Sequence, residues 1–286
     1  MQDSGQIRNI SDTALWVAVY RARESGRSDA LFHDPLASNL AGERGQQIAA
    51  TMPFAERHAW SYIARTWVID RFLHGQIEQG ADMVINLAAG LDTRPYRMPL
   101  PAALKWVEVD LPGLLAYKQE ILAGEQPRCA LERVPLDLAD VGTRRELFHR
   151  LGREAKRAVV VTEGLIVYFT EEEVRAFARD LAEQSSFRYW ALDLASPKLL
   201  QMLQKALGRQ LGQAGSPLRF APREGPDFFH SLGWEPEEVH SLLQTAAKLK
   251  RLSLGMRLLA LLPDPKGKHP DKPWGGVCVL ANRGSR

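Results

Sequence analysis

Cysteine is scarce in this chain, with two among 286 residues, and no cysteine or histidine pair has the spacing of a metal site. Cys129 and Cys278 lie far apart inside apolar runs, which predicts buried, reduced thiols. No apolar run approaches the roughly 20 residues that span a bilayer. The polar N-terminal stretch MQDSGQIRNISD lacks the apolar core of a signal peptide. We therefore expect a cytoplasmic protein with neither a metal nor a membrane partner.

Charge of one sign is not in excess either. The formal net charge is +3, and the lysines and arginines are dispersed, so we expect no nucleic-acid partner. With 45% hydrophobic and 25% charged residues, the composition is that of an ordinary globular protein, enough for one large domain or a core with a cap. No internal repeat or low-complexity linker divides the chain, and its oligomeric state stays open.

The hydrophobic pattern changes near residue 80. Before it, apolar residues recur at helical spacing in DTALWVAVYRARES, LFHDPLASNLAG and FAERHAWSYIARTWVIDRFLHGQIEQG. After it, short apolar runs alternate with helical segments, which predicts an α/β fold with a mostly parallel sheet and helices on both faces. We predict an N-terminal helical cap over 1–80, a core over 81–286 and a substrate-cap insertion at 197–230. The expected strands are 83–89, 105–110, 129–137, 157–164 and 188–195, with two more in GWEPEEVHSLL and WGGVCVLANR around a long helix.

The stretch VINLAAGLDTRPYRM, residues 84–98, runs from a buried strand into an abrupt polar turn. Open α/β sheets bind ligands at the carboxyl ends of their strands, so this turn is expected at a binding site. A dinucleotide would need the glycines of G-x-G-x-x-G, and of these only Gly90 is present. Asp92 and Pro95 also suit a pyrophosphate badly, because it needs a helix N-terminus free of anions. A nicotinamide-dependent oxidoreductase is therefore the weaker alternative.

Acidic residues end the next two strands. Asp110 ends KWVEVD, 20 residues after Gly90, where a carboxylate accepts hydrogen bonds from the ribose hydroxyls of an adenosine. Asp137 ends the third strand, where an acceptor suits the adenine amino group. The sequence thus offers a carboxylate for the ribose and an acceptor for the adenine, but no glycine-rich turn for a phosphate. This combination fits an adenosine that bears no phosphate. S-adenosylmethionine fits this description, although strand-end aspartates also commonly cap helices.

Several segments together resemble the leucine carboxyl methyltransferase family, which includes bacterial O-methyltransferases of the polyketide tailoring type. The segments are NLAAGLDTRPYRM, VEVDLPGLLAYK, VPLDL and TEGLIVYFTEEEV, in the family's order, preceded by TALWVAVYRARES…LFHDPLA and ARTWVID. The resemblance covers roughly residues 13–195. It implies a class I methyltransferase Rossmann-like fold, with seven strands of which the last is antiparallel. It also implies S-adenosyl-L-methionine as the cofactor.

The resemblance further implies roles for individual residues. Arg65 would pair with the methionine carboxylate, as a forked guanidinium suits that group, with Arg21 as a weaker second candidate. Glu163 would face the cationic methionine end. The other cofactor-binding candidates are Ala88 and Gly90 beside the methionine and ribose, Asp110 on the ribose with Leu111 next to it, and Asp137 and Leu138 at the adenine. Ala88 departs from the family, which usually has glycine there, and its methyl would crowd the cofactor unless it points into the core.

Methyl transfer is an in-line displacement at a sulfonium, so alignment and desolvation are the main tasks. A carboxylate acceptor needs no base, whereas a phenol does. No catalytic residue is assigned, and Tyr168 is a weak candidate. We expect an S-adenosylmethionine-dependent O-methyltransferase acting on a small anionic or aromatic molecule, with a carboxylate slightly favoured. Candidates that fit either the acceptor site or an ordinary structural role are Phe220, Phe228, Phe229, Trp234, Lys198, Lys205 and Arg209.

Three alternatives stay open from the sequence. The first is a nicotinamide-dependent oxidoreductase on a related fold. The second is a protein that binds the cofactor without turnover. The third is an enzyme that methylates the carboxy-terminus of a protein held in an open groove.

Overall fold

The structure of the chain is a computed structural model that describes residues 11–213 and 215–285. The first ten residues of the polar N-terminal stretch therefore lie outside the described residues. Of the described helices, none has the length and apolar character needed to cross a membrane. Cys129 and Cys278 are both buried and unpaired, as predicted, and burial raises the pKa of Cys129 to about 11.

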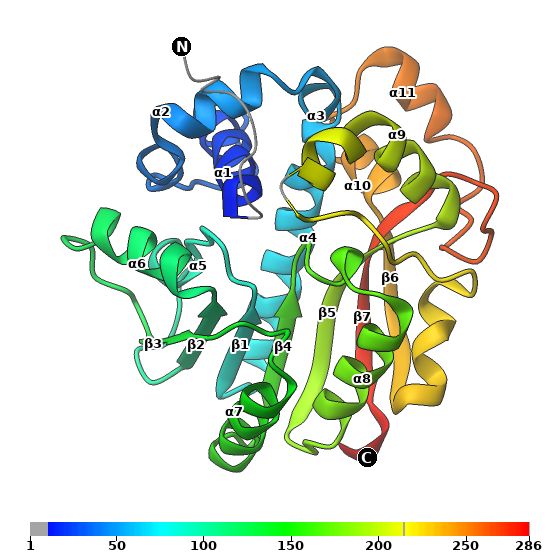
Figure 1. The fold of residues 1–286 in the computed structure, drawn as a ribbon. Helices are drawn as coiled ribbons and strands as arrows, with labels where there is room; N and C mark the ends of the chain where they lie inside the picture. The colour runs from blue at the N-terminus through cyan, green and yellow to red at the C-terminus, as the bar shows by residue number, and fades with distance from the viewer. Residues whose placement is uncertain (1–10, 214, 286) are drawn as a thin grey trace.

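Seven strands form one mixed sheet (Figure 1). They are β1 (Met83–Leu87), β2 (Lys105–Asp110), β3 (Ala130–Pro135), β4 (Ala158–Thr162), β5 (Phe187–Ala195), β6 (Trp234–Ser241) and β7 (Gly275–Asn282). Their order is β3-β2-β1-β4-β5-β7-β6, and β7 pairs antiparallel with both neighbours. The α/β fold class and the antiparallel last strand are thereby confirmed. β1 and β4 are buried throughout, as expected for apolar strands with both faces covered.

Helices precede, connect and follow the strands. They are α1 (Ser11–Ser25), α2 (Ala37–Ala50), α3 (Pro53–Arg57), α4 (Ala59–Glu78), α5 (Arg94–Arg97), α6 (Pro112–Ile121), α7 (Val141–Glu154), α8 (Glu171–Ala182), α9 (Pro197–Gln213), α10 (Leu242–Lys248) and α11 (Leu254–Leu259), with 3₁₀ turns η1 (Ile166–Tyr168), η2 (Gly225–Leu232) and η3 (Arg283–Ser285). The long helix expected between the last two strands is two short ones, α10 and α11. Lys250, with a left-handed φ of 58°, follows α10 and ends it.

Both faces of the sheet are covered by apolar helix surfaces. Neighbouring strand residues point to opposite faces, so Val84 packs with α4 while Ile85 packs with α7 and α8. The helices α1 and α2 form a second cluster with α6 and α9. Although α4 falls within the predicted cap of residues 1–80, it packs directly on the sheet. The division into cap, core and insertion stays a prediction.

Candidate active site

One cavity of about 1210 Å³ opens at the carboxyl ends of β1 to β5. This exceeds the roughly 300–1,000 Å³ of a typical small-molecule site, so there is room for a cofactor and a second ligand. Residues of α1, α3, α4, α9 and α11 also line it. Of these helices, α1, α3, α9 and α11 lie above the strand ends in Figure 1, whereas α4 runs down along the sheet. All the sequence-predicted candidates for the cofactor and for catalysis line this cavity: Arg21, Arg65, Ala88, Gly90, Asp110, Leu111, Asp137, Leu138, Glu163 and Tyr168.

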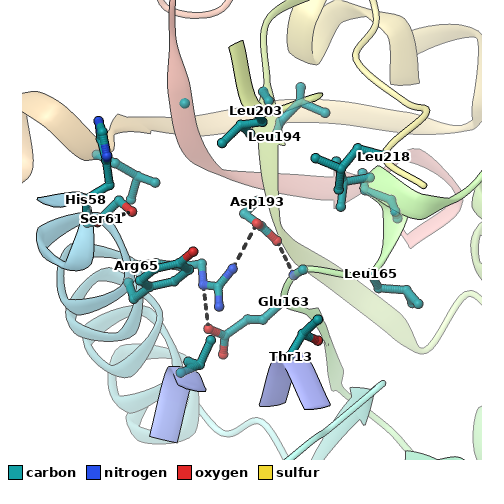
Figure 2. A pocket seen from close by; sticks show the side chains of 18 of the residues that line it. Thr13, His58, Ser61, Arg65, Glu163, Leu165, Asp193, Leu194, Leu203 and Leu218 are labelled. Carbon is teal, nitrogen blue, oxygen red and sulfur yellow. Dashed lines mark hydrogen bonds and ion pairs between the residues drawn. The ribbon is translucent and has the colours of Figure 1, made fainter. Parts of the chain in front are cut away.

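Buried ion pairs hold Arg65 at the centre of the cavity wall. Its Nη1 lies 3.0 Å from Asp193 Oδ2, at the end of β5, and its Nε lies 3.1 Å from Glu163 Oε2, just after β4 (Figure 2). Asp193 also accepts a hydrogen bond from the Gly164 backbone N–H at 2.6 Å. Burial acts to lower the pKa of Arg65, but Asp193 and Glu163 outweigh it and raise this pKa. The guanidinium therefore stays charged.

A second guanidinium, from Arg94, shares the Glu163 carboxylate. Arg94 Nε lies 2.6 Å from Asp70, Nη1 lies 2.9 Å from Asp92, and the side chain is only 2% exposed. Arg97 also forms an ion pair with Asp70, with 2.7 Å between Arg97 Nη1 and Asp70 Oδ2. Burial acts to raise the pKa of Asp92, but Arg94 and other nearby cations hold it well below its usual range. The network ties α4 to the turn after β1 and the loop after β4.

Negative charge is in excess within this connected network. Its guanidinium groups belong to Arg65, Arg94 and Arg97, and its carboxylates belong to Asp70, Asp92, Glu163 and Asp193. With all of them ionised, one carboxylate has no cation of its own. A ligand with one net positive charge would balance the site.

Asp110 ends β2 at the cavity, and two backbone N–H groups hold its carboxylate. Its Oδ2 accepts a hydrogen bond from Gly90 N and its Oδ1 accepts one from Leu111 N, each at 2.7 Å. Burial raises its pKa, although these two bonds act in the opposite direction. Each carboxylate oxygen keeps a further lone pair for a ligand hydroxyl. Leu138 is buried beside the cavity, whereas Asp137 is exposed and accepts a backbone hydrogen bond two residues along the chain, at 2.9 Å.

Ala88 adopts a conformation that favours glycine. Its φ is 55°, in the left-handed region, where an alanine is strained by roughly 1–2 kcal/mol. It is half-buried and packs against the main core while also lining the cavity. Its contact with the core is the condition under which the sequence predicts that the methyl is tolerated, and this tolerance stays a prediction.

Arg21 has structural partners. Its Nε donates to Asp34 at 2.8 Å and its Nη2 donates to the Leu91 carbonyl at 2.5 Å. These bonds hold α1 between the turn before α2 and the turn after β1.

Three functional candidates were missed by sequence reasoning. Asp193 carried the same signal as Asp110, an acid near the end of a buried strand. Arg94 lies in the quoted turn, but its partners are distant in sequence. His58 gave no signal. It precedes α4, lines the cavity and contacts the Phe54 carbonyl through Nδ1 at 2.8 Å. Because a carbonyl only accepts, Nδ1 carries the proton and the Nε2 of a neutral ring is a free base.

The aromatic and basic candidates for the acceptor site fall into two groups, those that line the cavity and those that do not. Phe220 lines the cavity. Phe229 and Trp234 surround Trp190 in the core, and Phe228 packs on Phe229. Lys198 and Lys205 are exposed and are not among the described lining residues, which supports the solvated-face interpretation. The Arg209 side chain lies outside the described residues.

The sheet order, the antiparallel β7 and a cavity at the carboxyl ends are those of the class I methyltransferase fold. The chain belongs to the leucine carboxyl methyltransferase family, whose model matches residues 14–182. It is 32% identical over 257 residues to a Parafrankia protein, covering 85% of this chain and 82% of that one. It is 30% identical over 293 residues to a Streptomyces coelicolor protein, covering 98% of each. A solved Thermobifida fusca structure matches with a TM-score of 0.56 and 17% identity, covering 98% of this chain and 96% of that one.

The three proteins are each named a "putative methyltransferase", and the first two names specify S-adenosyl-L-methionine. Family membership decides the cofactor in favour of S-adenosyl-L-methionine and against a nicotinamide. The chain is an S-adenosylmethionine-dependent methyltransferase.

Replacing Ala88 with glycine should raise the free energy of unfolding by about 0.5–1 kcal/mol. The gain is the relieved left-handed strain, partly offset by the greater freedom of glycine in the unfolded chain. Urea unfolding measures the difference. Ala89→Gly is the matched control, because Ala89 has no positive φ and should lose stability. Equal losses in both variants would contradict strain at residue 88.

The Asp92 carboxylate should make stability depend on acid pH. Its folded-state pKa lies below the unfolded value of about 3.9, so its contribution is present above that value and is lost as pH falls through the folded pKa. Asp92→Asn should cost about 2–3 kcal/mol at pH 7 and flatten the profile between pH 5 and pH 2. Thermal unfolding across that range is the measurement, with exposed Glu172→Gln as control. A profile as steep as that of the parent would remove Asp92 from this role.

Proposed function

We propose that this methyltransferase transfers its methyl group to an oxygen of a small molecule with a largely apolar body. The observation that carries the proposal is the lining of the cavity at the strand ends. The strand ends supply its charged part, and Leu194, Leu203, Leu207 and Leu218 line it elsewhere. Leu194, Leu203 and Leu218 lie on the far side of Asp193 from Glu163 in Figure 2. An acceptor held among these leucines would face the charged network.

The residues of the charged part fit S-adenosylmethionine. The cofactor has one carboxylate, one ammonium and one sulfonium, and its net positive charge matches the excess negative charge of the network. In the proposed arrangement Arg65 binds the methionine carboxylate and Glu163 faces the cationic end. Asp110 holds the ribose, with Ala88, Gly90 and Leu111 around it. Asp137 and Leu138 contact the adenine, the first by a hydrogen bond and the second by packing.

The chain's own residues would align the acceptor and exclude water. When bound, the cofactor supplies a methyl group already activated by the positive sulfur. Burial, with the nearby Tyr62, raises the pKa of Tyr168 to about 12, so its hydroxyl stays protonated at neutral pH. Tyr168 is therefore proposed as a hydrogen-bond donor that positions the acceptor oxygen, and not as a base. The apolar lining keeps the reacting oxygen poorly hydrated.

Two classes of acceptor oxygen fit this site. A carboxylate needs no base and remains the first candidate. A phenol or other hydroxyl is the second candidate, and His58 favours it because its Nε2 is available to take the hydroxyl proton. A polyketide-type acceptor has the required apolar body and either oxygen group. A protein carboxy-terminus and a cytoplasmic location stay predictions without further support here.

The acceptor class is tested with a panel of apolar carboxylic acids, phenols and amines of similar size. Transfer of the labelled methyl group from S-adenosylmethionine to the acids or phenols is the expected result. Transfer only to amines would overturn the assignment to oxygen. Transfer only to a carboxy-terminal peptide would favour the protein substrate.

Arg65→Ala should weaken S-adenosylmethionine binding much more than methylthioadenosine binding, because the second ligand lacks the amino-acid end. Asp110→Ala should weaken both ligands by about 1–3 kcal/mol, since both have the ribose. Calorimetric titration measures the four affinities. Arg71→Ala, an exposed arginine on the same helix, is the control. If Arg65→Ala lost the same affinity for both ligands, Arg65 would have a structural role and would not bind the methionine carboxylate.

His58→Gln should separate the two acceptor classes. With a phenol or hydroxyl acceptor, loss of a general base should lower kcat by about 10²–10⁴-fold. With a carboxylate acceptor, kcat should change little. An unchanged phenol rate would remove His58 from catalysis.

A further inference from the structure

Five leucines stand exposed on one short segment beside the cavity. This segment, residues 254–262, comprises α11 and the turn after it, and we call it the leucine lip. Its exposed side chains are Leu254 (79%), Leu258 (69%), Leu259 (51%), Leu261 (81%) and Leu262 (62%). Only three other large apolar residues are exposed in the part of the chain that the structure describes. Single exposed leucines are ordinary, but a contiguous group marks an interaction surface.

The leucine lip has apolar residues on its solvent side as well as its inner side. Met256 and Ala260 pack inward against the cluster formed by α4 and α10. Leu254 and Leu258 lie one turn apart, at i and i+4, on the same stripe of α11, and Leu261 follows in the turn after the helix. A stripe of this spacing normally faces a core, and here it faces outward.

The apolar surface of the lip continues into the cavity. Leu259 and Leu262 are exposed and also line the cavity, as does the exposed Met202 of α9. Figure 1 shows α9 and α11 together above the carboxyl ends of the central strands. An apolar molecule that enters past the lip would meet leucines all the way to the proposed acceptor position.

Lysines and arginines are frequent in the sequence on both sides of the leucine lip. Residues 248–272 contain seven lysines and arginines against two aspartates. Two of these cations have carboxylate partners outside the segment, Arg251 in Glu24 and Asp29 and Lys268 in Asp227. Lys248, Lys250, Arg257 and Lys266 are exposed. Leucines flanked by lysines and arginines are the composition of segments that lie in the interface of an anionic bilayer.

We propose that the leucine lip docks this enzyme on an anionic lipid surface, from which an apolar acceptor enters the cavity. Charge complementarity and the continuity of the apolar surface favour lipid as the occupant. The entry of the acceptor rests on the proposed function, whereas the docking does not. The sequence predicts no membrane partner because no apolar run in it is long enough to span a bilayer. A peripheral contact needs only the short lip.

Vesicle flotation tests the docking directly. The full chain is mixed with vesicles of phosphatidylcholine, or of equal parts phosphatidylcholine and phosphatidylglycerol. We expect binding to the mixed vesicles, and loss of at least about tenfold in affinity for the variant L254S/L258S/L261S. These leucines are not among the described cavity-lining residues. The matched control is I121S/V141S, which removes two exposed apolar residues elsewhere. K248Q/K250Q and added salt should each weaken binding.

Two results would overturn the proposal. One is the absence of binding to either kind of vesicle, or equal binding by the triple variant. The other is a dimer in light scattering that the triple variant abolishes while vesicle binding is absent, because a second copy would then cover the lip. S-adenosylhomocysteine titration of the same samples keeps the two proposals apart. The triple variant should retain this binding, and its absence in the parent chain would count against the cofactor site alone.

Discussion

The Glu163 carboxylate, shared by two buried guanidinium groups, is the contact on which the site depends. It joins Arg65 of α4 to Arg94 of the turn after β1, and Arg65 continues to Asp193 at the end of β5. Buried charges are stable only when paired, so each of these segments is held where its partner requires it. The network therefore fixes the strand ends and α4 relative to one another. It also gives the site the excess negative charge that suits a cationic cofactor.

Much of the fold was predictable from sequence because it depends on local patterns, and the candidate cofactor residues could be named from strand-end acids and from the family resemblance. The apolar runs that predicted β1 and β2 are bounded by turn signals, and a strand-end acid such as Asp110 is visible without a structure. The partners of Arg65 were not predictable, because Asp193 lies 128 residues away and only the folded sheet brings the two together. His58 depends on how α3 meets α4, which no local pattern encodes.

On the acceptor side of the cavity, too, the sequence reveals the helix but not the contacts that the fold creates. The amphipathic α9 was evident from the sequence, but which of its faces meets a ligand was not. Its lysines are exposed to solvent, and Leu199, Leu203, Leu207 and Leu211 line the cavity. The leucine lip has the opposite arrangement, with apolar residues outside. Together, the charged strand ends, the apolar acceptor region and the exposed lip form one continuous path from the surface to the proposed site of methyl transfer.

The central claim is that the strand-end cavity binds the nucleoside cofactor through its charged network and Asp110. Calorimetric titration of the parent chain with S-adenosylhomocysteine, with NADH as a parallel titrant, tests it most directly. The account predicts micromolar binding of S-adenosylhomocysteine and none of NADH. Absence of S-adenosylhomocysteine binding by the folded chain, or comparable binding of NADH, would contradict it.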